Sequence, residues 1–263
     1  ELAEDLINRV YYILLLNKKN VQSIDFSIFE SEYKMLKNKN SVDTSSKVLN
    51  SIDTWKKTIY PKSDGQNKYI QAVNQYDVIF GLGPAGTGKS YLAVAKAVQS
   101  LKKGNIDKII LYRHAVEAGE NLGFLPGDMK DKVDPDLRPI YDALYEMMPF
   151  ETVEKKIQEG IIEIAPVAFM RGRTFKNSFI IIDEAQNTSS IQMKMILTRL
   201  GYGSKMIING DLTQIDIKYI NDSGLSTAKN KLSNLKTIKF INLNKKDVVR
   251  HKIVSEIISA YEK

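Results

Sequence analysis

A glycine-rich run has the residue types and spacing of a phosphate-binding turn, and it consists of Gly83, Pro84, Ala85, Gly86, Thr87, Gly88, Lys89 and Ser90. It fits the pattern G-x-x-x-x-G-K-[ST], in which glycines let backbone N–H groups converge on phosphate oxygens. Lys89 would then reach the β- and γ-phosphates of a nucleotide, and the Ser90 hydroxyl would bind Mg²⁺. A glycine turn without a ligand is the competing interpretation. The apolar run 77–82 before the turn and the Ala/Val-rich run 91–98 after it favour a strand, a phosphate loop and a helix.

Two adjacent carboxylates, Asp183 and Glu184, follow directly on a second apolar run, 179–182. Asp183 is placed to hold Mg²⁺ through its water shell, opposite Ser90. Glu184 is placed to polarise a water molecule that attacks the γ-phosphate. A charged loop after a core strand is the alternative, but an acid next to the metal aspartate indicates hydrolysis by activated water.

A third motif, G-D-x-x-Q, spans 210–214 and follows another apolar run. The amide of Gln214 would sense the γ-phosphate or position water, and Asp211 would fix the loop. Further along, Asn244 and Asp247 stand at the spacing of the N-K-x-D motif that reads guanine. We discount this match because the other motifs point elsewhere, although the letters alone leave GTP open.

The remaining pattern indicates an α/β fold with a mostly parallel sheet covered by helices, because continuously apolar runs alternate with helical segments. The runs predicted as strands are 77–82, 108–112, 161–165, 178–183, 205–209 and 237–243. In such a sheet ligands bind at the carboxyl ends of strands, where all three motifs lie. Upstream, the spacing predicts helices over 2–16 and 26–36, a polar linker over 37–51, and a helix after Pro61 that turns Tyr69, Ile70 and Val73 inward.

Composition narrows the class of protein. The chain of 263 residues is 43% hydrophobic, enough for a substantial core, and has no apolar stretch long enough to cross a membrane. It contains no cysteine, which excludes disulfide scaffolds and is compatible with a reducing cytoplasm. A net charge of +7 and a pI near 9.2 suit either a polyanion partner such as RNA or simply a soluble surface. The first residue is Glu1 and not Met, so we expect the natural protein to extend further upstream.

The phosphate loop, D-E-A-Q and G-D-x-x-Q, in that order, resemble the first motor domain of superfamily 1 helicases and, more closely, the PhoH family of phosphate-starvation-inducible ATPases. The resemblance covers about residues 60–263, and its blocks are 81–98, 113–144, 164–174, 182–201, 210–216 and 247–251. It implies a RecA-like P-loop NTPase domain over 51–263 that uses ATP and Mg²⁺. It also implies that 1–50 holds the helical remnant of a KH-like N-terminal domain and the linker.

Several roles rest on this resemblance. Gln66 becomes the expected adenine-reading glutamine, whereas the residues alone favour a solvent-facing side chain. Arg250, in D-V-V-R-H, becomes the preferred transition-state arginine over Arg171, Arg173 and Arg199. A single motor core has no second lobe to donate such a residue, so we hypothesise a ring-like homo-oligomer, for example a hexamer, in which a neighbouring subunit supplies it. One departure is His114, which stands where the family has proline and relaxes the local backbone.

The predicted activity is therefore Mg²⁺-dependent ATP hydrolysis in the cytoplasm, coupled to RNA metabolism through single-stranded RNA or an RNA-processing protein. The lysines scattered over 205–246 would track a phosphodiester backbone or simply face solvent, and both interpretations stay open. A second function is an ATP-dependent switch that controls a protein partner without unwinding nucleic acid. A phosphotransferase is the third, and Glu184 argues against it because a water-activating acid suits hydrolysis.

Overall fold

The computed structural model describes residues 50–113, 129–166, 170–214 and 223–250, together with positions 253, 254, 257 and 260. The two helices predicted over 2–16 and 26–36 lie outside this part of the chain, as do most of the predicted linker and His114.

A six-stranded sheet forms the centre of the fold, with the order β5-β4-β6-β7-β3-β8 and every neighbouring pair parallel. Its strands are β3 (Val78–Leu82), β4 (Lys108–Arg113), β5 (Ile162–Pro166), β6 (Ser178–Asp183), β7 (Lys205–Gly210) and β8 (Ile238–Asn242). The predicted α/β class with a parallel sheet covered by helices is confirmed, and each predicted strand is present with bounds that differ by no more than one residue at either end. A separate antiparallel pair, β1 (Ile52–Asp53) and β2 (Thr58–Ile59), precedes the sheet.

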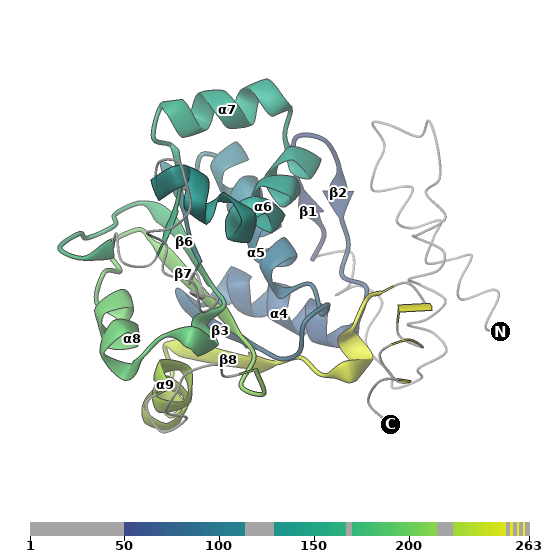
Figure 1. The fold of residues 1–263 in the computed structure, drawn as a ribbon, viewed down its shortest axis with the longest axis vertical. Coiled ribbons are helices and arrows are strands. Elements are labelled where there is room, and N and C mark those ends of the chain that lie inside the picture. The colour runs from purple at the N-terminus through teal and green to yellow at the C-terminus, as the bar shows by residue number, and fades with distance from the viewer. Residues whose placement is uncertain are drawn as a thin grey trace.

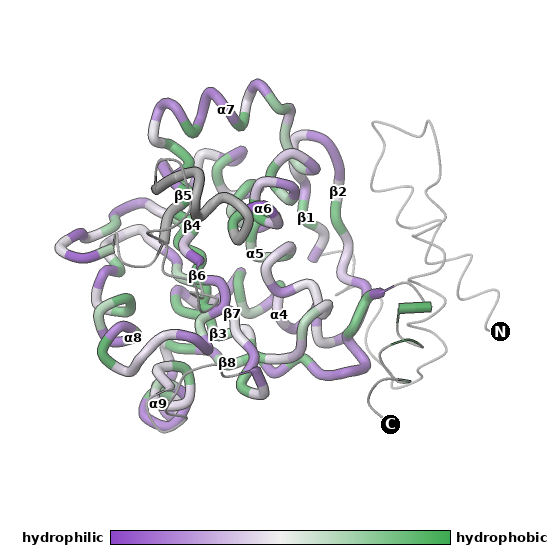
Figure 2. The backbone as a smooth tube through the Cα atoms, viewed as in Figure 1, coloured by the Kyte–Doolittle hydropathy of each residue, from purple (hydrophilic) through white to green (hydrophobic). Residues whose placement is uncertain are grey.

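Successive strand residues enter two different cores, one on each face of the sheet. In β6, Phe179 and Ile181 belong to one buried cluster, whereas Ile180 and Ile182 belong to the other. Both faces are therefore apolar, which explains why the strands read as continuous hydrophobic runs. Figure 2 shows these runs as hydrophobic segments in the middle of the molecule.

Helices cover both faces of the sheet (Figure 1). The helical elements are α4 (Asp64–Gln75), α5 (Lys89–Lys102), α6 (Met129–Met147), α7 (Phe150–Gln158), η3 (Ala185–Asn187), α8 (Ser190–Leu197), α9 (Gly224–Leu232) and η5 (Lys245–Asp247). Helices α4, α5 and α6 supply side chains to one core, and α8 and α9 supply them to the other. The predicted helix after Pro61 is α4, and its Tyr69, Ile70 and Val73 are buried as expected. Within the described ranges, no helix has both the length and the apolar character that a membrane span requires.

The strand order brings the three sequence motifs together. All six strands point the same way, so their carboxyl ends share one edge of the sheet. Strand β7 lies between β3, which leads into the phosphate loop, and β6, which ends at Asp183. The loop after Gly210 therefore starts between the phosphate loop and the two carboxylates.

Candidate functional site

The phosphate loop leaves the N-terminus of α5 open to a ligand. Helices α4, α8 and α9 are each preceded by a serine whose side chain accepts a backbone N–H of the first turn. Helix α5 is preceded by Gly88, which has a left-handed conformation and provides no side-chain cap. The first N–H groups of α5 therefore keep the partial positive charge of a helix start. An anion in the loop is the natural partner for them.

The Lys89 ammonium is held inside the loop. Its Nζ donates to the carbonyl oxygens of Gly83 at 2.5 Å and Pro84 at 2.9 Å, and to Thr87 Oγ1 at 3.3 Å. Burial lowers the pKa of Lys89, and the carboxylates of Asp183, Asp211 and Glu184 partly offset this effect. The lysine thus lies among acceptors that phosphate oxygens can replace.

Ser90 and Asp183, the two residues predicted to bind Mg²⁺, are in direct contact. Ser90 Oγ donates to Asp183 Oδ1 over 2.6 Å, and the Asp183 side chain is almost fully buried. Burial raises the pKa of Asp183, while the Ser90 hydrogen bond and the nearby cations Arg113 and Lys89 lower it. A hydroxyl and a carboxylate side by side form the hard oxygen donor set that Mg²⁺ prefers.

Glu184 is held at both carboxylate oxygens. Arg113 Nη2 donates to Oε1 over 3.2 Å, and Gln186 Nε2 donates to Oε2 over 2.6 Å. The Glu184 backbone has φ 53° and ψ 39°, in the left-handed region that residues other than glycine rarely adopt. The turn at this residue directs the chain from β6 into η3.

The loop after β7 is fixed by Asp211. Its Oδ1 accepts from Thr213 N over 2.9 Å and from Thr213 Oγ1 over 2.7 Å, while the backbone N–H of Asp211 donates to Gln186 Oε1 over 3.1 Å. The other oxygen, Oδ2, is buried without a protein partner, although Asp211 lines the cavity. A buried, unpaired carboxylate oxygen suits a hydrated cation or an ordered water molecule.

Arg250 lies against the phosphate loop of its own chain. The backbone N–H of Val249 donates to Gly86 O over 2.9 Å, so the segment before Arg250 is hydrogen-bonded to the loop. A Cβ added to Gly86 would come within 2.4 Å of Arg250 Nε, and Gly86 has φ +82°. A side chain at position 86 would therefore be strained and would displace the guanidinium.

Asp247 anchors this segment to the start of α4. Its Oδ1 accepts from Ser63 Oγ over 2.7 Å and from Gly65 N over 3.1 Å, and its Oδ2 accepts from Asn244 N over 2.9 Å. Both oxygens are thus engaged within the protein, and Asp247 is only 5% exposed. The Asn244 side chain in turn accepts from Lys246 N. The letters of the N-K-x-D motif therefore form a capping structure here, which supports discounting them as a guanine reader.

We expect Asp247→Ala to lower the free energy of unfolding by about 2 kcal/mol, because three hydrogen-bond donors lose a buried, charged acceptor. Urea unfolding measures this loss. Glu159→Ala is the matched control, since it removes an acid from the exposed i,i+4 pair with Lys155 and should cost less than about 0.5 kcal/mol. Equal losses in the two variants would contradict the anchoring role.

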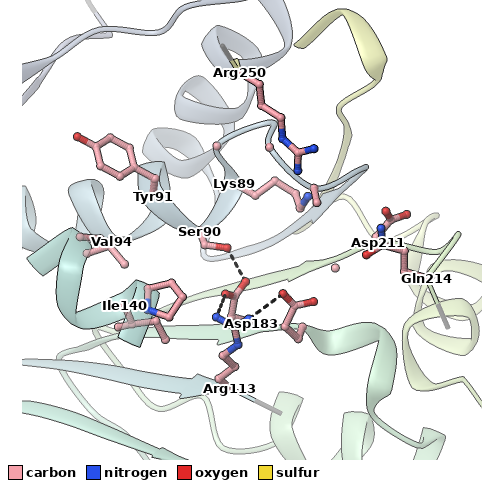
Figure 3. Close-up of a pocket in the computed structure, with 17 residues that line it drawn as sticks. Lys89, Ser90, Tyr91, Val94, Arg113, Ile140, Asp183, Asp211, Gln214 and Arg250 are labelled. Atoms are coloured by element: carbon pink, nitrogen blue, oxygen red, sulfur yellow. Dashed lines mark hydrogen bonds and ion pairs between the residues drawn. The ribbon is translucent and has the colours of Figure 1, made fainter. Parts of the chain in front are cut away.

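Most of the predicted site residues line one cavity of about 520 Å³, whereas Gln66, Gly83, Pro84 and Thr87 are not on its wall. Lys89, Ser90, Asp183, Glu184, Gln214 and Arg250 lie on its wall, together with loop residues Ala85, Gly86 and Gly88. Figure 3 shows Lys89 and Arg250 on one side of Ser90, with Tyr91, Val94 and Ile140 on the other. The second half of the cavity is thus apolar and lies between α5 and α6, a feature that the sequence did not indicate.

Gln66 is buried next to the phosphate loop, so it does not face solvent. Its Oε1 accepts from Lys62 N over 2.7 Å, and its Nε2 donates to Thr87 O over 3.0 Å. The amide therefore connects the chain before α4 with the loop.

The other arginines that we considered for the transition state lie elsewhere. Arg173 forms a bidentate pair with Glu163 on β5, and Arg199 donates to the carbonyl oxygens of Met195 and Arg173. Arg171 is exposed and does not line the cavity. Arg250 is thus the only one of the four candidates on the cavity wall.

Two residues of the site received no catalytic role from the sequence. Arg113 pairs with Asp183 and Glu184, and Gln186 joins Glu184 to the backbone of Asp211. The role of Gln186 could have been inferred from its place in the D-E-A-Q motif, directly after the two acids. Arg113 follows directly on a predicted strand, but the sequence does not show which strand pairs with it, and so it could not place Arg113 beside Asp183.

The chain is similar in sequence to a known protein family over most of its length. The family model described as PhoH-like protein matches residues 58–262. The PhoH-like protein of Bacillus subtilis (strain 168) is 51% identical over 254 residues, which cover 97% of this chain and 74% of that protein. The PhoH-like protein of Mycobacterium tuberculosis (strain ATCC 25618 / H37Rv) is 54% identical, and Protein PhoH of Escherichia coli (strain K12) is 40% identical, each over 205 residues. The chain spans 58% of each of these two proteins.

Among solved structures, the Pif1 helicase of Candida albicans has a remote likeness, with a TM-score of 0.38 and 16% identity over 76% of this chain and 43% of that one. The family match, by contrast, covers most of the chain and is supported by high identity along its length. The chain therefore belongs to the PhoH family.

Proposed function

We propose that this chain binds ATP with Mg²⁺ and hydrolyses the γ-phosphate. The observation that carries the proposal is the cavity in which an uncapped helix start and Lys89 face Asp183, Glu184 and Gln214. Membership of the PhoH family and the phosphate loop support a P-loop NTPase in general terms. Hydrolysis is inferred from the acids.

The phosphates would lie in the loop between Gly83 and Ser90. The N–H groups at the start of α5 and the Lys89 ammonium would exchange their present surroundings for phosphate oxygens. Ser90 Oγ and Asp183 would hold Mg²⁺, and the unpaired Asp211 Oδ2 would accept from its water shell. When bound, the metal neutralises phosphate charge.

Glu184 is the proposed base. Its carboxylate would accept a proton from the attacking water, and Gln186 fixes the direction of that carboxylate through Oε2. Gln214 extends from the loop that Asp211 holds rigid, and we assign it the positioning of water or the γ-phosphate. Arg250 supplies a guanidinium over the phosphate loop, the place where an arginine can stabilise transferred negative charge.

ATP is the proposed nucleotide. The engagement of Asp247 within the protein leaves no free carboxylate there for guanine. Gln66 stays the proposed adenine reader on the basis of the family resemblance, and a base would have to share or replace its bonds with Lys62 N and Thr87 O. Because its amide also bonds Thr87 O, a base that contacts Gln66 would be coupled directly to the phosphate loop.

The coupled process is proposed to be RNA metabolism in the cytoplasm, with single-stranded RNA or an RNA-processing protein as partner. A ring-like homo-oligomer, such as a hexamer, also stays a prediction. The need for a neighbouring subunit to supply an arginine is weaker, because Arg250 of the same chain already lies at the phosphate loop. If light scattering finds only a monomer and that monomer has full ATPase activity, the ring hypothesis is wrong.

The decisive experiment is the ATPase rate with and without single-stranded RNA, measured alongside mass in solution. Mg²⁺-dependent turnover that RNA stimulates supports the proposal as stated. Turnover that only a protein partner stimulates supports the ATP-dependent switch instead. An absence of turnover in every condition would contradict both.

A further inference from the structure

Strand pairing places Arg113 beside the two carboxylates of the site. Arg113 ends β4, and Asp183 ends β6, and the two residues are register partners in adjacent parallel strands. Arg113 Nη1 lies 3.9 Å from Asp183 Oδ2, and Nη2 lies 3.2 Å from Glu184 Oε1. One guanidinium therefore forms ion pairs with both acids, and its side chain is only 19% exposed.

The other cations of the cavity engage different groups. Lys89 Nζ donates to the loop carbonyls of Gly83 and Pro84 and to Thr87 Oγ1. Arg250 lies against Gly86. Within the part of the chain that the structure describes, Arg113 is the cation that forms ion pairs with Asp183 and Glu184. Two adjacent acids, one of them almost fully buried, would repel one another strongly without it.

The same acids are those assigned to metal loading and water activation. A divalent cation beside Asp183 would replace the charge that Arg113 now supplies, and it would repel the guanidinium. The Ser90 hydrogen bond to Asp183 Oδ1 shows that the oxygen nearest the phosphate loop is separate from Oδ2, which faces Arg113. Metal and arginine would therefore approach one carboxylate from two directions.

We propose that Arg113 is the resident counter-ion of the Asp183–Glu184 pair and competes with Mg²⁺ for it. Loading of the metal weakens the hold of Arg113 on Glu184 Oε1, while Gln186 keeps Oε2 in place. Glu184 thereby gains a free oxygen for water only after the metal has arrived. Arg113 is thus a positioning residue that orders the two events, and this inference rests on the proposed role of Asp183.

The test is a titration of the nucleotide-free chain with Mn²⁺ alone. Electron paramagnetic resonance measures the concentration of free Mn²⁺ and therefore the affinity. Arg113→Gln should bind Mn²⁺ about tenfold more tightly than the wild type, because the substitution removes the repulsion between the guanidinium and a dication held by the neighbouring carboxylate. Mg²⁺ should displace the bound Mn²⁺, and adding Asp183→Asn should abolish the gain. Arg250→Gln is the matched control, since it removes a charge from the same cavity without touching the acids, and its gain should be clearly smaller.

An unchanged or weaker Mn²⁺ affinity in folded Arg113→Gln would overturn the proposal, as would an equal gain in Arg250→Gln. If Arg113→Gln does not fold, as judged by circular dichroism, Arg113→Met provides the same comparison with more of the aliphatic stem retained. The proposed function is checked separately by Mg²⁺-dependent binding of a fluorescent ATP analogue. If the ATP analogue still binds but the wild type and Arg113→Gln have equal Mn²⁺ affinities, the counter-ion proposal is wrong and the proposed nucleotide site stands.

Discussion

Replacing Glu184 with glutamine should leave ATP affinity within about twofold of the wild type and lower kcat by about 10²–10⁴-fold, the usual contribution of a general base. Glutamine keeps the length and shape of the side chain but cannot accept a proton from water at neutral pH. The effect should fall on kcat because Glu184 lies on the cavity wall but is not part of the phosphate loop that is proposed to bind ATP. Single-turnover hydrolysis of ATP, together with equilibrium binding of a fluorescent analogue, separates the two quantities.

Glu163→Gln is the matched control for this experiment. Glu163 is also a partly buried acid paired with an arginine, Arg173, but it lies on β5 and does not line the cavity. Its replacement should reduce stability, because Arg173 and Tyr112 lose a charged acceptor, and should leave kcat nearly unchanged. Unimpaired hydrolysis in Glu184→Gln would remove the assignment of Glu184 as the base.

Lys89→Ala should reduce ATP affinity by at least about 100-fold, which is the scale expected when a buried, charge-assisted contact to phosphate is lost. The ammonium is already surrounded by loop acceptors, so it needs little reorganisation to meet a phosphate oxygen. Titration with a fluorescent ATP analogue, or calorimetry with a non-hydrolysable one, measures the change.

Lys96→Ala separates this effect from a general loss of positive charge on α5. Lys96 lies further along the same helix, is partly buried, and donates to Gln99 Oε1 over 2.5 Å, away from the cavity. Burial and the neighbouring ammonium groups of Lys103 and Lys205 lower the pKa of Lys96 to about 8. Its replacement should leave ATP affinity nearly intact, and a comparable loss in both variants would contradict a specific role for Lys89.

The strands and the motif positions could be predicted because each depends on a short stretch of sequence. Phe179 to Ile182 are apolar without interruption, since both faces of β6 are covered, and the acids follow where this apolar run ends. The phosphate loop is equally local, because its glycines, Lys89 and Ser90 serve one turn.

The remaining features depend on strand order, which local patterns do not encode. Arg113 meets Asp183 only because β4 pairs with β6, and Arg250 reaches Gly86 only because β8 returns beside β3. From the residues alone Gln66 would face solvent, yet it is buried, because a single helical position cannot reveal that the phosphate loop packs over it. The apolar half of the cavity arises where α6 crosses α5, far apart in sequence from the acids.

The left-handed backbone conformation of Glu184 implies that the residue best for activity at this position differs from the residue best for stability. A non-glycine residue in this conformation costs roughly 1–2 kcal/mol, which glycine or asparagine would largely avoid. A library randomised at position 184 and selected for heat resistance alone should therefore enrich glycine and asparagine. The same library selected for turnover should return glutamate. If both selections return glutamate, then its bonds to Arg113 and Gln186 outweigh the backbone strain even without catalysis.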